Sequence, residues 1–153
     1  GLTKSIGDLA GACLFATTMG ISRMLYGKFG EKIDLIKFML ISGVICVVSY
    51  LLAGLSAMPI WGLVGCVMCG FSVGIMWPGS ISITAPRIPK GGTALFALLA
   101  MAGDMGGAFG PSVVGYFSQH AGDNLQAGLL TGCIFPLIML ATLIAMKKMT
   151  PEG

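Results

Sequence analysis

The chain has 153 residues, a formal net charge of +3, 56% hydrophobic residues and only 10% charged residues. Water-soluble domains carry about 25% charged residues, so a soluble fold of this length would lack polar cover for its surface. The composition instead predicts an all-α, polytopic membrane protein that has the lipid bilayer as its surroundings. A nucleic-acid partner is not expected, because no basic face extends beyond the short connectors.

A bilayer core of ~30 Å requires about 20 apolar residues in each crossing helix. Five apolar runs approach that length, and each is expected to be helical because unpaired backbone groups are costly in lipid. The predicted helices of this single transmembrane domain, residues 1–153, cover approximately residues 5–25, 37–56, 60–83, 93–117 and 125–146. Pro78, Pro111 and Pro136 lie inside the last three and are expected to kink them.

Basic and non-basic connectors alternate along the chain. The connectors after the second and fourth helices carry no Lys or Arg. The basic residues that follow the first, third and fifth helices are Arg23, Lys28, Lys32, Lys37, Arg87, Lys90, Lys147 and Lys148. The positive-inside rule therefore predicts five crossings of a plasma or bacterial inner membrane, with the N-terminus outside and the C-terminus cytoplasmic.

Polar and aromatic residues inside these helices are the first site candidates. Asp8, near the start of the first helix, either lines an outer vestibule or is an interfacial carboxylate favoured by the helix dipole. Trp77, in the third helix, either contacts solute or simply packs and anchors at the interface. Cys66 and Cys69 form a lone CxxC with apolar flanks and are interpreted as packing residues, so no metal or cofactor is predicted.

Asp104 is the one charge within the fourth helix, about midway between Lys90 and His120. A charge near the bilayer centre costs roughly 2.5–3.5 kcal/mol and marks a functional-site hypothesis by default. As a functional group, Asp104 is expected to bind a proton or solute from a central cavity. The alternative is a structural role, such as pairing with a helix outside this chain.

The fourth helix also carries small residues at spacings of three and four, which place several of them on one face. They are predicted to form a helix-packing interface, and the alternative is that this interface also slides to switch access. These residues, with the proline among them, are Gly103, Gly106, Gly107, Gly110, Pro111 and Gly115.

Three local patterns stand along the chain: the basic, glycine-bearing loop 23–32, the tetrapeptide Met76-Trp77-Pro78-Gly79, and the Gly-x-x-x-Gly-Pro element that ends at Pro111. Together they resemble the C-terminal portion of a major facilitator superfamily transporter, over helices eight to twelve of the usual twelve. The loop departs from the family's motif, because Gly27 stands where that motif has an aspartate and Arg23 where it has a glycine.

The resemblance implies two six-helix halves built from inverted three-helix repeats, with the solute at the midplane. It also implies that Arg23, Gly30, Lys32 and Arg87 are gating or loop residues at the cytoplasmic surface. A minority interpretation turns Arg23 into the cavity to meet an anionic solute. The missing N-terminal helices of the same transporter would then be partners of an incomplete C-terminal fragment. A free-standing five-helix protein is the alternative.

The first functional hypothesis is secondary active transport of a small organic solute by alternating access. Proton coupling and a sugar-like solute are finer expectations, the latter by family analogy alone. A non-transporting membrane-integral subunit or assembly protein is the second hypothesis. An enzyme is not expected, because the chain lacks a clustered set of His, Cys, Ser or Asp at membrane depth.

Overall fold

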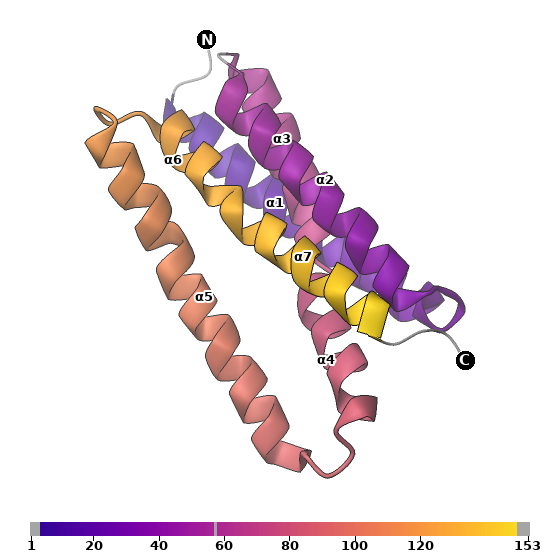
Figure 1. Cartoon of the computed structure of the whole chain (residues 1–153). Helices are drawn as coiled ribbons and strands as arrows, with labels where there is room; N and C mark the ends of the chain where they lie inside the picture. Colours follow the sequence, from indigo (N-terminus) through magenta and orange to yellow (C-terminus); the bar gives the residue numbers. More distant parts are fainter. Residues whose placement is uncertain (1–3, 57, 150–153) are drawn as a thin grey trace.

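The structure is a computed structural model that describes residues 4–56 and 58–149. Within these ranges the regular elements are all helical, and they form five spans that are long and apolar enough to cross a membrane. The elements are α1 (Lys4–Phe29), η1 (Gly30–Lys32), α2 (Leu35–Leu55), α3 (Pro59–Val73), α4 (Met76–Arg87), α5 (Gly92–His120), α6 (Leu125–Gly132) and α7 (Ile134–Met149) (Figure 1). The predicted all-α fold with five membrane-length helices is confirmed.

Two of the five spans are divided into two helices near a proline. Proline has no N–H, so the carbonyl four residues earlier loses its helical donor. For Pro78 that carbonyl belongs to Gly74, which lies in the break between α3 and α4. For Pro136 it belongs to Gly132, the last residue of α6 before the break that leads into α7. By contrast, α5 continues as one helix through Pro111.

Side chains at the connectors cap the helices. The Asp34 carboxylate accepts a hydrogen bond from the Lys37 backbone N–H at 3.1 Å, and its Oδ2 lies 2.9 Å from the Lys37 ammonium. The side-chain hydrogen bond from Lys37 lowers the pKa of Asp34. Asn124 caps α6 in the same way through the Gln126 N–H, and the Gln126 amide donates to the Ser56 carbonyl at the end of α2 at 2.7 Å. Both polar ends of α2 are therefore satisfied.

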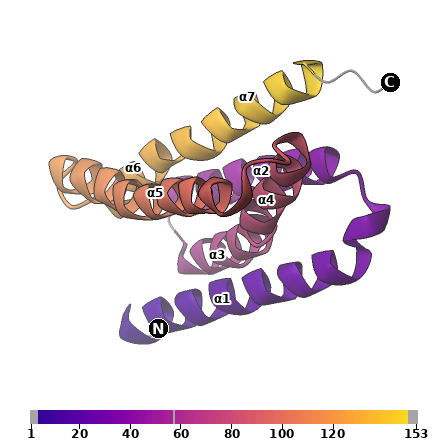
Figure 2. The same cartoon turned by 90° about the horizontal axis from the view of Figure 1, so that it is seen from below.

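The helix α3 packs between α1 and α2, and α2 also packs against α6 and α7. In Figure 2, α1 and α7 lie on opposite sides of the bundle with α2, α3 and α4 between them. The backbones of α1 and α3 approach closely at Gly70, where an added methyl group would press on the Phe15 carbonyl. Nearby, the Thr18 hydroxyl donates to the Val67 carbonyl at 3.1 Å. Close approach through small residues is the packing expected of membrane helices.

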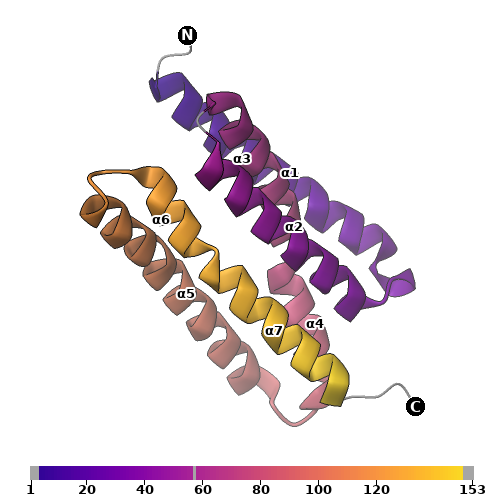
Figure 3. The same ribbon diagram turned by 45° about the horizontal axis from the view of Figure 1, so that its top comes forward.

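The helix α5 is attached mainly at its C-terminal end, where it packs against α6, and more sparsely to α4 (Figures 1 and 3). None of the residues of α5 is buried in the described part of the chain. Large apolar side chains on α5, such as Leu98, Met105 and Phe109, are more than half exposed. The described chain therefore consists of a packed unit of α1, α2 and α3 and a long α5 that is largely uncovered.

Candidate functional site

Asp104 lies in the middle of α5, about 18 Å from the start of the helix and about 24 Å from its end at 1.5 Å per residue. Its side chain is exposed. No hydrogen bond or ion pair joins it to another residue within 4–56 or 58–149. The carboxyl group is therefore accessible in the middle of a membrane-length helix. Both predicted roles, binding a proton or solute and pairing with a helix outside this chain, require such access.

Trp77, the second residue of α4, reaches α5 at Gly103, the residue that precedes Asp104. A methyl group added at Gly103 would lie 2.8 Å from Cζ3 of the indole, so the ring rests against the α5 backbone. Trp77 remains 41% exposed. Successive residues of a helix are turned by about 100°, so Asp104 flanks the face that Trp77 contacts. Two of the three predicted solute or proton candidates thus lie in neighbouring parts of the structure, because Trp77 contacts the residue that precedes Asp104. The side chain of the third, Asp8, lies outside the described part.

The C-terminal end of α1 and the following η1 place two of the predicted gating residues, Arg23 and Gly30, near the α3–α4 span. The Arg23 guanidinium donates from Nε to the Gly74 carbonyl at 3.3 Å. The Tyr26 hydroxyl donates to Ser82 Oγ of α4 at 3.4 Å. Gly30 makes room for the Tyr26 ring, since an added methyl group there would lie 2.8 Å from Cε2. The absence of a side chain at Gly30 therefore leaves space for the Tyr26 ring, whose hydroxyl reaches α4.

The other two predicted gating residues end helices. Lys32 is the exposed last residue of η1, and Arg87 is the exposed last residue of α4. Both are basic residues in the last turn of a helix, where a cation interacts favourably with the helix dipole.

The glycines of α5 differ in their surroundings. Gly103 contacts Trp77, whereas a methyl group added at Gly106, Gly107, Gly110 or Gly115 would meet no described atom within 4 Å. Packing through those four positions stays a prediction. The helical period places Gly103, Gly107 and Gly110 within an arc of about 60°. Their shared face is thus the face that already contacts α4 at Gly103.

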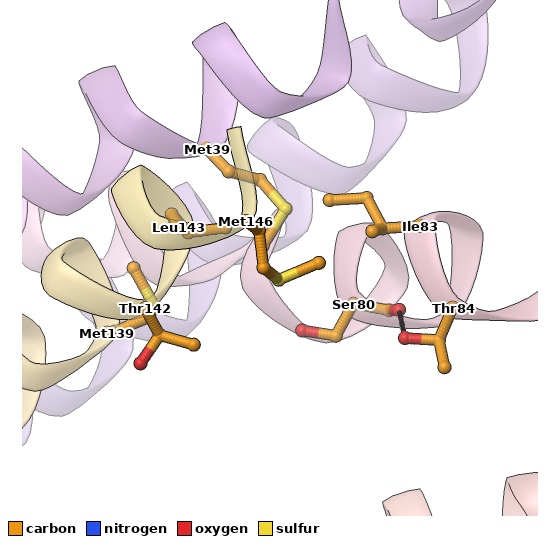
Figure 4. A pocket seen from close by; sticks show the side chains of 8 residues that line it. All are labelled: Met39, Ser80, Ile83, Thr84, Met139, Thr142, Leu143 and Met146. Carbon is orange, nitrogen blue, oxygen red and sulfur yellow. Dashed lines mark hydrogen bonds between the residues drawn. The ribbon is translucent and has the colours of Figure 1, made fainter. Parts of the chain in front are cut away.

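A cavity of 150 Å³ lies between α2, α4 and α7 (Figure 4). It is lined by Met39, Ser80, Ile83, Thr84, Met139, Thr142, Leu143 and Met146. Its hydroxyl groups donate within their own helices; for example, Ser80 donates to the Met76 carbonyl at 2.7 Å. The cavity is thus effectively apolar, and it is smaller than the roughly 300–1,000 Å³ of small-molecule sites. Sequence reasoning missed it because its residues are spread over three helices and form no local pattern.

A second cavity, of 170 Å³, lies among α1, α2, α3 and α6 and includes Cys66 and Cys69 with Tyr50. All five cysteines are free. No group of three or more His, Cys, Asp or Glu residues is placed to hold a metal ion among the described residues. Neither of these two cavities includes Asp104 or Trp77, and both of those side chains are exposed.

The sequence of the chain is similar to known proteins over most of its length. The sequence profile of the Major Facilitator Superfamily matches residues 1–152. The chain is also 27% identical over 145 residues to a multi-drug resistance efflux pump, PmrA, from two strains of Streptococcus pneumoniae, an alignment that covers 88% of the chain. The chain spans only 36% of the length of these relatives. No solved structure matches it.

Proposed function

Because the chain belongs to the major facilitator superfamily, we propose that it supplies five membrane-spanning helices of a secondary active transporter that moves a small organic solute by alternating access. The observation that carries this proposal is the family match over nearly the whole of a chain with five membrane-length helices. The match to a family of transporters, which are not enzymes, argues against the subunit and enzyme alternatives. We further propose that the basic connectors face the cytoplasm, as the positive-inside rule requires.

The solute is proposed to be a small organic compound that is exported. This choice is supported by the name of the pneumococcal relatives, which are multi-drug resistance efflux pumps. A sugar-like solute has only the family likeness around Trp77 in its favour. Export is tested by expressing the full-length protein in a pump-deficient bacterial strain and measuring both drug tolerance and sugar uptake. Raised tolerance supports export, and sugar uptake without raised tolerance contradicts it.

Asp104 is proposed as the proton-coupling group. It is a carboxyl group at membrane depth, it has no partner in the described part of the chain, and it flanks Trp77. Asp104→Asn in the full-length protein is expected to abolish the dependence of transport on an imposed pH gradient. Asp123→Asn, which removes a carboxylate from the α5–α6 connector, is the matched control and is expected to keep it. Unchanged coupling in Asp104→Asn would remove Asp104 from this role.

The open face of α5 is proposed to pack against a further helix of the same transporter. Three observations support this: the chain spans 36% of its relatives, α5 buries no described residue, and methyl groups added at Gly106, Gly107 and Gly110, which lie within an arc of about 100°, would meet no described atom within 4 Å. Gly107→Leu is then expected to destabilise the full-length protein, because it fills the space that the other helix needs. Ala108→Leu, which lies about 100° away on the same helix, is the control. Equal stability of the two variants contradicts the packing proposal.

A further inference from the structure

The junction of α3 and α4 contains a backbone acceptor that the helix cannot satisfy. The residue four positions after Gly74 is Pro78, which has no N–H to donate. Gly74 and Ile75 nevertheless keep helical dihedral angles, with φ, ψ of −54°, −36° and −84°, −20°. The two half-helices therefore meet without a loop, at a point where the hydrogen-bond ladder of the helix is interrupted and where Pro78 leaves the Gly74 carbonyl without its helical donor. Such a point is a natural bending site.

Arg23 supplies the missing donor from another helix. Its Nε lies 3.3 Å from the Gly74 carbonyl oxygen, and the two residues are 51 positions apart in the sequence. The α1 backbone lies directly against the junction, since a methyl group added at Gly74 would be 2.7 Å from the Met19 carbonyl and 2.8 Å from Ser22 Cβ. A side-chain donor in place of a backbone N–H, at this long distance, makes a separable bond, because the side chain can move away without breaking a helix.

The two halves of this span are held very differently. The helix α3 packs along both α1 and α2, and its Gly70 admits the α1 backbone. The helix α4 has 12 residues, of which only Gly79 is buried. Its links to other helices include the packing of Gly79 against the flexible Met39 side chain of α2, the Tyr26–Ser82 hydrogen bond and the contact of Trp77 with Gly103. A rotation about the junction would therefore move α4, and Trp77 with it, while α3 stays in place.

We infer that Arg23 is a positioning residue that latches α4 at the Pro78 hinge, and that release of the Arg23–Gly74 hydrogen bond lets α4 turn relative to α3. The purpose of this latch rests on the proposed function, since the turn would move Trp77 relative to the part of α5 that carries Asp104. The evidence for the latch is the geometry around Arg23 and Gly74, which does not depend on that function. If Arg23 has only a topological role, as one of several cytoplasmic positive charges, replacing Pro78 is not expected to change the effect of removing Arg23.

Amide hydrogen exchange of the full-length protein in lipid nanodiscs tests the latch. The N–H of Gly79 bonds to the Ile75 carbonyl at 2.8 Å just beyond the hinge, so its exchange reports opening of α4. Arg23→Gln is expected to raise exchange in the first turn of α4 by about tenfold, which corresponds to ~1.4 kcal/mol. Adding Pro78→Ala returns an N–H that can donate to Gly74, so the double variant is expected to exchange at or below the wild-type rate.

Three controls separate the latch from a general effect of charge or proline removal. Lys28→Gln removes a nearby positive charge that lies 5.5 Å from the Phe29 ring, and it is expected to leave α4 exchange unchanged. Pro136→Ala repairs the equivalent break between α6 and α7 and is expected not to rescue Arg23→Gln. Arg23→Lys, which keeps a cationic donor, is expected to fall between wild type and Arg23→Gln.

The inference requires that Arg23→Gln no longer speeds α4 exchange once Pro78 is replaced by Ala. A double variant that exchanges about tenfold faster than Pro78→Ala alone would therefore overturn it, as would an unchanged α4 in Arg23→Gln. If Arg23→Gln fails to fold, Pro78→Ala alone decides the matter, because the inference requires it to slow α4 exchange in the presence of Arg23. Failure of the transport proposal is recognised separately: a protein that moves no solute yet shows the coupled exchange retains the latch and loses the function.

Discussion

The contact of α1 with α3 at Gly70 predicts a large and site-specific cost for one added methyl group. In a Gly70→Ala variant the new Cβ would press on the Phe15 carbonyl and lie 2.5 Å from Thr18 Oγ1. The Phe15 carbonyl belongs to the α1 backbone and cannot turn aside as a side chain can. The two helices must therefore separate by roughly 1 Å, a gap that forfeits a quarter to a half of the dispersion attraction along the interface.

The magnitude follows from three contributions. Overpacking of this kind costs about 1–3 kcal/mol. Separation also stretches the hydrogen bond from Thr18 to the Val67 carbonyl, 3.1 Å long here, which contributes about 0.5–1.5 kcal/mol. In the opposite direction, replacing a helical glycine by alanine raises the free energy of unfolding by about 0.5–1 kcal/mol. The free energy of unfolding is therefore expected to fall by about 2 kcal/mol in Gly70→Ala, within a range of about 0.5–4 kcal/mol.

Gly62→Ala on the same helix is the matched control. A methyl group at Gly62 meets no described atom within 4 Å, so only the helix-propensity gain applies, and stability is expected to rise by up to about 1 kcal/mol. Reversible unfolding of the full-length protein in mixed micelles, followed by far-ultraviolet circular dichroism, measures both variants. Equal stabilities for Gly70→Ala and Gly62→Ala would refute the close α1–α3 contact.

Three further variants test other interactions with the same unfolding assay. Gly103→Ala is expected to cost about 1 kcal/mol by displacing the Trp77 ring, and to cost nothing in a Trp77→Ala background, since the added methyl group lies 2.8 Å from that ring alone. Ser22→Ala removes a buried hydroxyl with no described hydrogen-bond partner, so it is expected to be neutral or to stabilise by up to about 1 kcal/mol; a larger loss would reveal a partner. Asp34→Asn removes the interaction with Lys37 that lowers the Asp34 pKa below 3.8, so the variant is expected to be less stable than wild type above that pH and to converge with it as the pH falls through the lowered value.

Local composition predicts the number of helices and the places where they break. Helix number follows from apolar runs of bilayer length, and the break points follow from prolines, because each proline removes the donor of the fourth residue before it. Counting back from Pro78 in this way identifies Gly74 as the residue whose carbonyl lacks a helical donor. Pro111 follows the same rule, yet α5 remains one helix, so a proline permits a break without requiring one.

The features that the sequence does not predict all join residues that are distant in the chain. The basic charge of Arg23 fits the alternation of connectors, but nothing local indicates that its partner is a carbonyl 51 residues away. Trp77 and Asp104 stand in different predicted helices, and only the contact of Trp77 with Gly103 brings them together. The cavity between α2, α4 and α7 is likewise built from three separate helices. Such contacts depend on how the helices pack in three dimensions, which no local pattern specifies.

The distribution of glycine in this chain indicates which helices are held in place. Gly65 and Gly70 of α3 are approached by neighbouring backbone, with the Ser49 carbonyl 3.0 Å from a methyl group added at Gly65. A shift of α3 would therefore disrupt its packing against α1 and α2 at the same time. The α4 half of the same span buries one described residue, and α5 buries none.

Rigid elements that move against each other need small interfaces between them, since the apolar packing that a movement disrupts must be re-formed when it ends. Of the predicted functional residues, Trp77 lies on α4, which buries one residue, and Asp104 lies in the part of α5 that precedes its packing against α6. Arg23 joins α1, and with it the packed unit, to the start of α4. A change of access would therefore need only α4 and α5 to rearrange, with the Gly74 junction as the point where the packed unit controls them.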